Sequence, residues 1–371
     1  MTGNESEPAR RVQLLGLRPG MARSAVAGAV AAAGEPAYRT DQVMEWMYVR
    51  RARSFDVMTN VPLPLRERMD EEFSLRPADR SFEGRSTDGT IKHLWRLADG
   101  EEVESVLIPT PGRITLCLSS QVGCALGCRF CATGDFGFRR QLDTGEIVGQ
   151  FRDADRIART AYERPIGNLV YMGMGEPLAN QDAVFDSLEI IHAGFGLGAR
   201  RITVSTVGLI PGILALAELP QPFKLAVSLH APNHELRLSL VPIERRYPID
   251  DLFAAIDEYQ GRKGRRVTFE YTLIDGVNDA EDTARELVGL LGRRLVFVNL
   301  IPWNPIPSRD WKASPASAVR RFLSVLTDAG VPAAIRTPRG QDIAAACGQL
   351  RLERGLSGAA ASGVAPNPDP E

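Results

Sequence analysis

Short apolar runs alternate with helical segments from residue 114 onward, and this alternation most constrains the fold. Six buried strands are expected in the runs ITLCLSSQ, GNLVYMGMGE, RITVSTVGL, FKLAVSLHA, RVTFEYTLID and LVFVNLIPW, with PAAIRTP as a further short one. Helical segments separate them at 143–160, 180–194, 211–218, 249–262, 280–292 and 316–329. Buried strands joined by helices form parallel sheets with right-handed crossovers. The sequence therefore predicts an α/β fold, a partial (βα)6 barrel of the TIM type.

The segments on either side of this unit have other patterns. Residues 21–82 carry helical spacing of apolar residues and are expected to form a small N-terminal helical domain. Short β-rich runs around a DG turn predict hairpin strands at 84–109, so the barrel with its β-hairpin extension is expected to cover 83–354. Residues 1–20 and 355–371 are polar or rich in small residues and Pro, and we expect flexible tails there.

The composition is that of an ordinary globular protein, with 24% charged and 44% apolar residues among 371. No run of about 18 apolar residues is present, which argues against a transmembrane helix. The N-terminus lacks the apolar core of a secretory signal, so a cytoplasmic location is expected. A net charge of -2 provides no global attraction to nucleic acid, but it leaves room for a local basic surface.

Four of the five cysteines crowd into the stretch CLSSQVGCALGCRFC, and three of them, Cys124, Cys128 and Cys131, have the spacing C-x3-C-x2-C. An odd number of closely spaced thiols is a poor disulfide framework and indicates metal or redox chemistry. A structural zinc site needs four ligands, usually in two paired halves, and the second half is missing. Three thiolates suit an iron–sulfur cluster with one iron left open. Zinc is the weaker alternative.

The unusual residues follow the predicted strands. The cysteine loop comes after the first strand, GMGEP after the second, STVG at the third, SLHAPN after the fourth and IPWNP after the sixth. Functional residues of such barrels gather where strands end and βα loops begin. One convergent site is therefore expected. The alternative, that these are merely polar loop residues, does not explain five such loops at the same end.

The cysteine motif, with an aromatic residue before its last cysteine, resembles the hallmark of the radical S-adenosylmethionine (SAM) enzymes. This resemblance implies a radical-SAM barrel with a 4Fe-4S cluster on Cys124, Cys128 and Cys131, and SAM chelating the open iron. GMGEP is similar to the segment that meets the methionyl amine there, because its glycines allow close approach and Glu176 offers an anionic acceptor. Taken alone, this segment could equally be a tight turn.

A closer resemblance covers residues 36–350. In order, VESVLIP, Cys117, GCRFCATG, GMGEPL, STVG, SLHAPN, IPWNP and RGQDIAAACGQL resemble the RlmN/Cfr family, whose members methylate C2 or C8 of an adenosine in RNA. The N-terminal helical segment is also similar to that family. Only the two tails fall outside the resemblance.

The family's chemistry implies roles for the two remaining cysteines. One SAM methylates Cys347, and a second SAM yields the radical that takes hydrogen from the S-methyl group, so two are used per turnover. The methylene then adds to adenine, and Cys117 helps to resolve the adduct, leaving a Cys117–Cys347 disulfide. Arg336 and Arg339 precede Cys347 and would favour its thiolate. Free cysteines commonly just pack as small hydrophobes, and for Cys117 that alternative stays open.

The resemblance also carries over to other positions. Glu104 matches the family's proton acceptor and could act as a general base at the barrel edge, although a solvated strand charge is the alternative. Contacts with the cofactor are implied for Gly175, Glu176, Ser205, Ser228, Leu229, His230 and Asn304.

The implied substrates are 23S rRNA at the peptidyl-transferase centre and the adenosine 3′ of the anticodon in some tRNAs, with the base splayed out of its stack. An electron donor such as flavodoxin with its reductase, no membrane and a monomer are also implied. Basic pairs are candidates for a phosphate-binding rim, at 139–140, 200–201, 245–246, 262–263 and 265–266. The alternatives are methylation at C8 and a non-catalytic iron–sulfur or zinc RNA-binding protein, which would have no use for Cys347.

Overall fold

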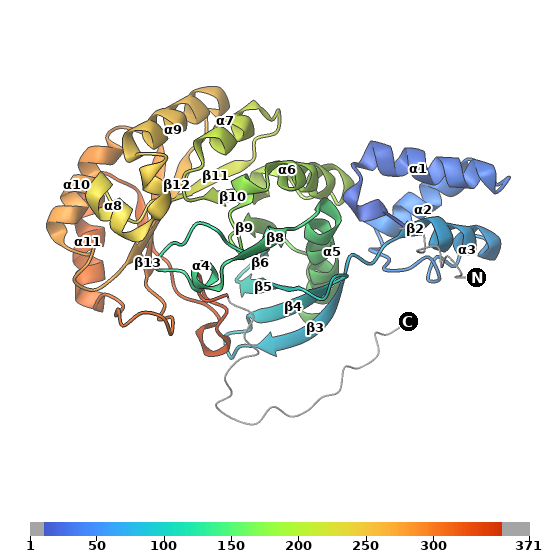
Figure 1. Ribbon diagram of the computed structural model, residues 1–371, viewed down its shortest axis with the longest axis horizontal. Coiled ribbons are helices and arrows are strands. Elements are labelled where there is room, and N and C mark those ends of the chain that lie inside the picture. Colours follow the sequence, from blue (N-terminus) through green and yellow to red (C-terminus); the bar gives the residue numbers. More distant parts are fainter. Residues whose placement is uncertain (1–10, 351–371) are drawn as a thin grey trace, which may run out of the picture.

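The computed structural model describes residues 11–350, and a ten-stranded sheet forms its centre (Figure 1). The sheet order is β14-β13-β12-β11-β10-β9-β6-β5-β4-β3, and neighbouring strands from β14 to β6 are parallel. These parallel strands are β6 (Arg113–Cys117), β9 (Asn168–Tyr171), β10 (Ile202–Thr206), β11 (Lys224–Ser228), β12 (Val267–Leu273), β13 (Val296–Pro302) and β14 (Ala333–Ile335). The predicted partial barrel is confirmed.

Helices connect the strands and cover the outer face of the sheet (Figure 1). They are α5 (Thr144–Ala161), α6 (Gln181–Glu189), α7 (Ile210–Glu218), α9 (Ile249–Lys263), α10 (Glu281–Leu291) and α11 (Ala316–Asp328). The short helices α4 (Ala132–Phe136) and α8 (His234–Leu240) were not expected from the sequence. None of the described helices is long and apolar enough to span a lipid bilayer.

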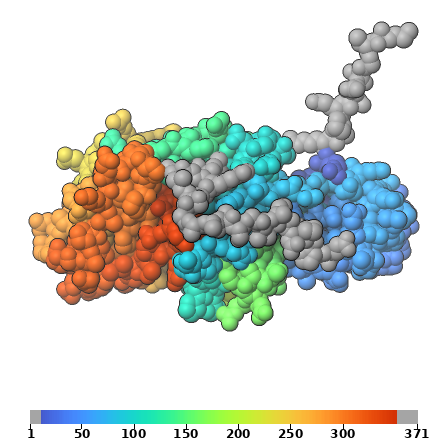
Figure 2. Space-filling view, turned by 90° about the horizontal axis from the view of Figure 1, so that it is seen from below, coloured from blue at the N-terminus to red at the C-terminus, as the bar shows by residue number. Residues whose placement is uncertain are grey.

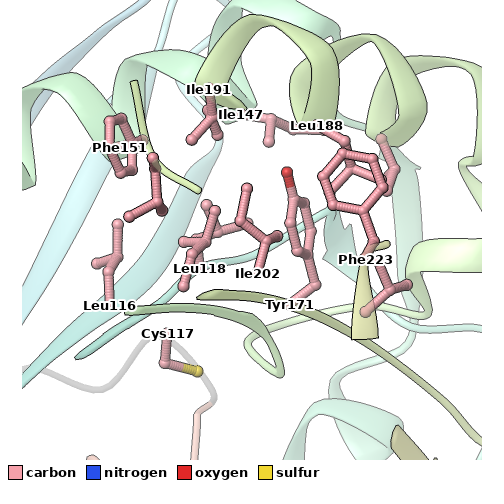
Figure 3. Packing of buried hydrophobic residues seen from close by; sticks show 14 of the residues in the cluster. Leu116, Cys117, Leu118, Ile147, Phe151, Tyr171, Leu188, Ile191, Ile202 and Phe223 are labelled. Atoms are coloured by element: carbon pink, nitrogen blue, oxygen red, sulfur yellow. The ribbon is translucent and has the colours of Figure 1, made fainter. Parts of the chain in front are cut away.

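The two faces of β6 separate the core from the interior of the barrel. Figure 3 shows Leu116 and Leu118 on the side of the helices, with Phe151 of α5 among the residues packed there, whereas the sulfur of Cys117 points to the other side of the sheet. Successive side chains of a strand point to opposite faces, so this alternation follows from the strand itself. Cys117 therefore faces the barrel interior.

The β extension is added to the edge of β6. Its strands are β3 (Ala78–Arg85), β4 (Ile91–Leu97) and β5 (Glu102–Thr110), and all three pairings, from β3 to β6, are antiparallel. Strands were expected at 84–109, so the extension begins earlier than predicted. It takes residues 78–82 from the predicted helical domain, whose last helix ends at Glu72.

The N-terminal helices are α1 (Pro19–Ala32), α2 (Tyr38–Tyr48) and α3 (Leu63–Glu72). Residues 11–20 were predicted to belong to a flexible tail, but β1 (Val12–Gln13) pairs with β2 (Phe73–Ser74), and Leu14 and Leu15 are fully buried. A single apolar pair is too short to give a periodic signal, which explains the wrong prediction. The rest of that tail and the whole of the C-terminal one lie outside the described residues.

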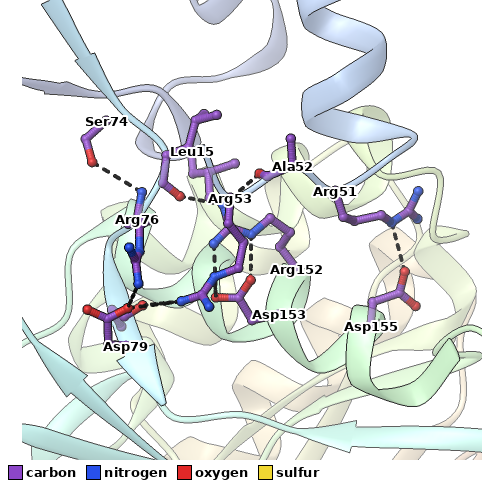
Figure 4. A network of polar contacts seen from close by, with 12 residues as sticks. Leu15, Arg51, Ala52, Arg53, Ser74, Arg76, Asp79, Arg152, Asp153 and Asp155 are labelled. Atoms are coloured by element: carbon purple, nitrogen blue, oxygen red, sulfur yellow. Dashed lines mark hydrogen bonds and ion pairs between the residues drawn. The ribbon is translucent and has the colours of Figure 1, made fainter. Parts of the chain in front are cut away.

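Buried ion pairs fix the N-terminal helical part against α5 (Figure 4). Arg51 follows α2, and its Nε lies 2.8 Å from Asp155 Oδ2 on α5. Arg152, also on α5, is fully buried between Asp153, at 2.8 Å, and the carbonyl of Ala52, at 3.2 Å. Charges buried this deeply need such partners. They place the helical part firmly beside the barrel.

The segment after β14 links the barrel to the extension. The amide of Gly340 donates to Asp88 Oδ2 at 3.0 Å, and the amide of Thr87 donates to Asp342 Oδ2 at 3.1 Å. In Figure 2 the red end of the described chain lies between the orange part of the barrel and the cyan strands. This segment carries Cys347, so the extension helps to position that residue.

Candidate active site

A cavity opens at the carboxyl ends of the parallel strands and has a volume of about 950 Å³, including the part that is open to solvent. Many of the predicted site residues line it: Cys124, Cys128, Cys131, Gly175, Glu176, Ser205, Ser228, His230, Asn304 and Cys347. Cys117, Glu104 and Leu229 are not part of the lining. The βα loops thus converge on one site, as expected for a barrel of this type.

The cysteine loop runs from β7 (Gln121–Gly123) to α4. The amide of Cys124 donates to the carbonyl of Gly137 at 2.9 Å, and the amide of Cys131 donates to the carbonyl of Cys128 at 3.1 Å. Gly123 has a φ of +78°, and a Cβ there would lie 1.7 Å from the Gly137 oxygen. Only glycine fits at this crossing. The loop therefore holds its three thiols on one wall of the cavity.

The donor set can be tested against the groups that would bind it. Among residues 11–350, no three His, Cys, Asp or Glu side chains are placed to hold a single metal ion. A zinc ion would need its ligands within about 2.3 Å. An iron–sulfur cluster has several atoms of its own between its thiolates, so it suits thiols that are further apart. Three thiols facing open space fit such a cluster better than zinc.

The GMGEP segment is fixed to the loop that follows β6. The amide of Glu176 donates to Gln121 Oε1 at 2.7 Å, and a Cβ on Gly175, whose φ is +100°, would lie 2.5 Å from Gln121 Cβ. The Glu176 carboxylate accepts the amides of Leu178 at 3.1 Å and Val207 at 2.9 Å. Burial raises the pKa of Glu176 to about 7. The carboxylate thus joins its own loop to the segment after β10, and the amide joins it to Gln121 of β7.

His230 follows β11 in a left-handed conformation, with a φ of 61°. Its Nδ1 accepts the Thr272 amide at 2.9 Å, so the proton of the neutral ring is on Nε2, which has no hydrogen-bond partner among the described residues. Burial lowers the pKa of His230 to about 3, so the ring stays neutral. The ring of Phe130 packs against it in a tilted arrangement, with 4.1 Å between ring centroids and 55° between the ring planes. His230 therefore presents an N–H donor at the cavity.

Cys347 is exposed, and its loop is tied to two others. Asn304 Nδ2 donates to the Cys347 carbonyl at 3.0 Å, and Asn304 Oδ1 accepts from Gln341 Nε2 at 2.8 Å. The amide of Ala132, directly after the cysteine motif, donates to the Gly348 carbonyl at 2.8 Å. The Cys347 loop is thus held between the segment after β13 and the cysteine motif.

Cys347 lies near enough to Cys117 to influence it electrostatically. Burial raises the pKa of the Cys117 thiol to about 12, the charge of Cys347 adds to that rise, and Arg336 opposes it. These are short-range effects across the barrel interior, between residues 230 positions apart in the chain. Packing alone does not require a second thiol next to Cys117.

Two of the predicted site residues, Glu104 and Leu229, do not line the cavity. Glu104 is fully buried and forms a 3.2 Å ion pair with Lys92 Nζ, so it is not a solvated carboxylate at the barrel edge. It lies two positions along β5 from Val106, which pairs with Cys117 across the strands, and so faces the same side of the sheet. The Leu229 side chain is buried in the core cluster and does not reach the cavity.

Two charged residues of the lining were not predicted as site residues. Glu270 is in the middle of β12 and Arg336 directly follows β14. Glu270 could have been found from the sequence. It is a charged residue inside the apolar run VTFEYTL, and a strand covered on both faces rarely carries one without a function. Arg336 had been considered only for its closeness in sequence to Cys347.

Part of the predicted basic rim lies away from this cavity. Residues 200–201 precede β10 and residues 265–266 precede β12, so both pairs lie at the opposite end of the sheet. Arg262 is paired with Glu218 and with Glu258. Arg140 binds Asp99 and Glu146, at 2.6 and 2.8 Å. The sequence alone does not show at which end of the sheet a charged pair next to a strand lies. The pairs were therefore predicted together.

Comparisons with known proteins agree with this arrangement. Residues 118–288 match the radical SAM superfamily, and residues 17–75 match the ribosomal RNA large subunit methyltransferase N-terminal domain. The chain is 44% identical over 352 residues to the dual-specificity RNA methyltransferase RlmN of Marinobacter nauticus, covering 92% of this chain and 93% of that one. It is 46% identical over 336 residues to the protein of the same name from Anaeromyxobacter dehalogenans, covering 89% and 90%.

A solved structure gives the same result for the fold. The crystal structure of a radical SAM methyltransferase from Sphaerobacter thermophilus superposes with a TM-score of 0.88 at 48% identity, covering 92% of this chain and 100% of that one. The two matched segments cover the N-terminal helices and the part of the barrel from the cysteine loop into α10. The chain belongs to the RlmN family of radical SAM RNA methyltransferases.

Proposed function

We propose that the protein methylates C2 of an adenosine in 23S rRNA, and of the adenosine 3′ of the anticodon in some tRNAs. The presence of Cys347 in the same cavity as the three loop cysteines, with Cys117 facing the barrel interior, carries this proposal, because a SAM-dependent transfer to an ordinary nucleophile needs no further thiols. The relatives' printed name, dual-specificity RNA methyltransferase, supports two kinds of RNA substrate. We prefer C2 to C8 because the relatives are of the RlmN type.

In this proposal Cys124, Cys128 and Cys131 hold one 4Fe-4S cluster, and SAM binds in the cavity. Together the bound groups supply one-electron chemistry that removes hydrogen from an unactivated carbon. His230 Nε2 and Glu270 Oε2 are buried polar atoms of the lining without a hydrogen-bond partner among the described residues. Such atoms are suited to binding a polar cofactor. Ser205 and Ser228 add hydroxyls at the ends of β10 and β11.

Cys347 carries the methyl group. Its thiol is exposed in the cavity, so its sulfur can attack the methyl carbon of one SAM, with S-adenosylhomocysteine as the leaving group, and later present the S-methyl group to a second SAM. Asn304 and Gln341 hold its loop through the hydrogen bonds described above. The methylene formed there joins adenine, and the base must be unstacked to reach it. Cys117 then attacks the Cys347 sulfur, releasing methyladenosine and leaving a disulfide.

Replacing each cysteine tests the proposal. Cys347→Ala is expected to abolish methylation, because no other thiol at this position can carry the methyl group. Cys117→Ala is expected to accumulate a covalent protein–RNA adduct, because resolution lacks its nucleophile. The measurement is anaerobic turnover followed by mass spectrometry of the nucleosides and of the protein. Normal amounts of 2-methyladenosine from Cys347→Ala would refute the methyl-carrier role, and 8-methyladenosine from the wild type would establish the Cfr-type alternative.

The electrons would come from a low-potential donor such as flavodoxin with its reductase, which also returns the Cys117–Cys347 disulfide to thiols. We further propose a cytoplasmic monomer, since the RNA substrates are in the cytoplasm. The domain division is proposed as an N-terminal helical part that contacts RNA and a barrel that holds the site. The match of residues 17–75 to a methyltransferase N-terminal domain supports this division.

A further inference from the structure

A charged pair on the cavity wall, Glu270 and Arg336, has no role so far in the resolving step. Glu270, on β12, is 5% exposed, and its Oε2 lies 3.8 Å from Nη1 of Arg336. Glu270 Oε1 accepts from Asn299 Nδ2 on the neighbouring strand at 2.9 Å. The amide of Arg336 donates to the Leu300 carbonyl at 2.8 Å. Both the backbone and the side chain of Arg336 are therefore held in place.

Arg336 lines the same cavity as Cys347, and the sulfur of Cys117 points into the interior of the barrel. Cys347 is the largest influence raising the pKa of Arg336, and Glu270 and Cys117 act in the same direction. In return, Arg336 lowers the pKa of Cys117. Arg339 has a different place, because its Nη1 lies 3.9 Å from Asp88 Oδ2 of the extension and it does not line the cavity.

The other charged groups near these sulfurs do not replace Arg336. His230 is neutral for the reason given above, and Glu176 lies in the loop after β9. Lys92 faces the same side of the sheet as Cys117, but it is ion-paired with Glu104 at 3.2 Å. A thiolate on Cys117 would be a buried anion, which is costly without a nearby cation.

We propose that Arg336 activates Cys117 as the nucleophile of the resolving step, with Glu270 and Asn299 positioning its guanidinium beside the two sulfurs. The inference rests on the proposed function. In that step Cys117 gives up its proton and its sulfur bonds to the Cys347 sulfur. The bond from that sulfur to the methylene carbon breaks, and its electron pair stays on the carbon. The carbon takes up one proton, so the step balances without an external oxidant.

The burial of Cys117 explains why its thiol needs a nearby cation in order to react. A buried thiol is protonated and unreactive, so it does not attack Cys347 while the methyl group is being loaded. A fixed guanidinium lowers the cost of the thiolate by being in place beforehand, so no group has to move as the charge forms. In the resolving step Glu270 acts through Arg336, as a positioning residue.

The test isolates the attack of Cys117 on the Cys347 sulfur. The anaerobic cluster-loaded protein is treated with 2,2′-dithiodipyridine, which places a mixed disulfide on the exposed Cys347. Cys117 then displaces pyridinethione and closes the Cys117–Cys347 disulfide. The reaction is quenched at intervals, and mass spectrometry measures how much of the mixed disulfide has been converted into the Cys117–Cys347 disulfide. Cys117→Ala, which cannot carry out this second step, serves as the blank. The assay needs neither RNA nor turnover, so its failure is distinct from failure of RNA methylation.

Arg336→Met keeps most of the side-chain length and removes the charge, and we expect it to slow the second step at least about threefold. One unit in the pKa of Cys117 changes its thiolate fraction tenfold. A more basic thiolate is also more nucleophilic, and this recovers about half of the tenfold loss on a logarithmic scale. A slowing of about threefold remains. Arg336→Lys keeps the charge and is expected to retain most of the rate.

The matched control is Arg339→Met, which removes a cation from the same segment but outside the cavity; its rate is expected to stay near wild type. An unchanged rate in Arg336→Met would overturn the proposal. So would an Arg336→Lys variant as slow as Arg336→Met, or a slowing by Arg339→Met of the same size. Thermal melts of all three variants are recorded beside the rates, and equal melting temperatures exclude a general loosening of the loop.

Discussion

Glu104 shows how a residue's surroundings limit its chemical role. The resemblance offered it as a general base, and a carboxylate in that role needs access to the proton it takes. In the structure it is fully buried in an ion pair with Lys92, on the face of the sheet that also carries Cys117. A role in stability and a role in proton transfer therefore have to be separated by experiment.

Glu104→Gln is expected to lower the free energy of unfolding by about 3–5 kcal/mol, because it leaves Lys92 a buried charge without its carboxylate. The double variant Lys92→Met with Glu104→Leu removes both charges and is expected to recover most of that loss. Urea unfolding measures both. RNA methylation by the double variant then decides the chemistry: full activity would show that Glu104 is not the proton acceptor, and a folded, inactive protein would support that role.

At the scale of the elements, the sequence predicted what local patterns can specify. The starts of the parallel strands and of the long helices between β6 and β14 were predicted to within one residue, because each strand is a buried apolar run and each helix has one apolar face. The short helices α4 and α8 were missed. The capping box at Asp143 and Glu146 is formed at the start of α5. Residues that act only across the fold were missed, such as Glu270, and so was the direction in which flanking arginines point.

Asp143→Ala tests that cap. Asp143 Oδ1 accepts the Glu146 amide at 2.7 Å, so its removal leaves an amide of the first turn without a partner and is expected to cost about 1 kcal/mol. The measurement is the urea midpoint of unfolding. Asp251→Ala is the control, since Asp251 is in the first turn of α9 without being its cap. Equal midpoints for the two variants would contradict a capping role.

At the scale of the whole molecule, the N-terminal helical part meets the barrel through close contacts at glycine. A Cβ on Gly149 of α5 would lie 2.3 Å from Pro77 Cγ, and one on Gly194 would lie 2.7 Å from the ring of Tyr48. With the buried pairs of Arg51 and Arg152, these contacts leave little freedom between the two parts. The helical part therefore holds a fixed direction relative to the cavity.

Gly149→Ala is expected to destabilise the protein by about 1–3 kcal/mol, because proline ring atoms cannot move aside as a flexible side chain would. Gly261→Ala is the matched control, in the interior of α9, where a Cβ would have nothing within 4 Å. That change is expected to be neutral or to stabilise by up to about 1 kcal/mol. Thermal melting and limited proteolysis between the two parts check both variants, and an unaffected Gly149→Ala would show that the contact is loose.

The position of Cys347 has a consequence for how the enzyme is made. On the ribosome, the cysteine loop and Cys117 emerge long before β14, Arg336 and Cys347, which are synthesised more than two hundred residues later. A nascent or prematurely terminated chain therefore has the loop for the cluster but lacks the residue that takes the methyl group. In the proposed mechanism such a chain cannot form the covalent link to RNA. Completion of synthesis thus acts as a checkpoint before the radical chemistry can reach its substrate.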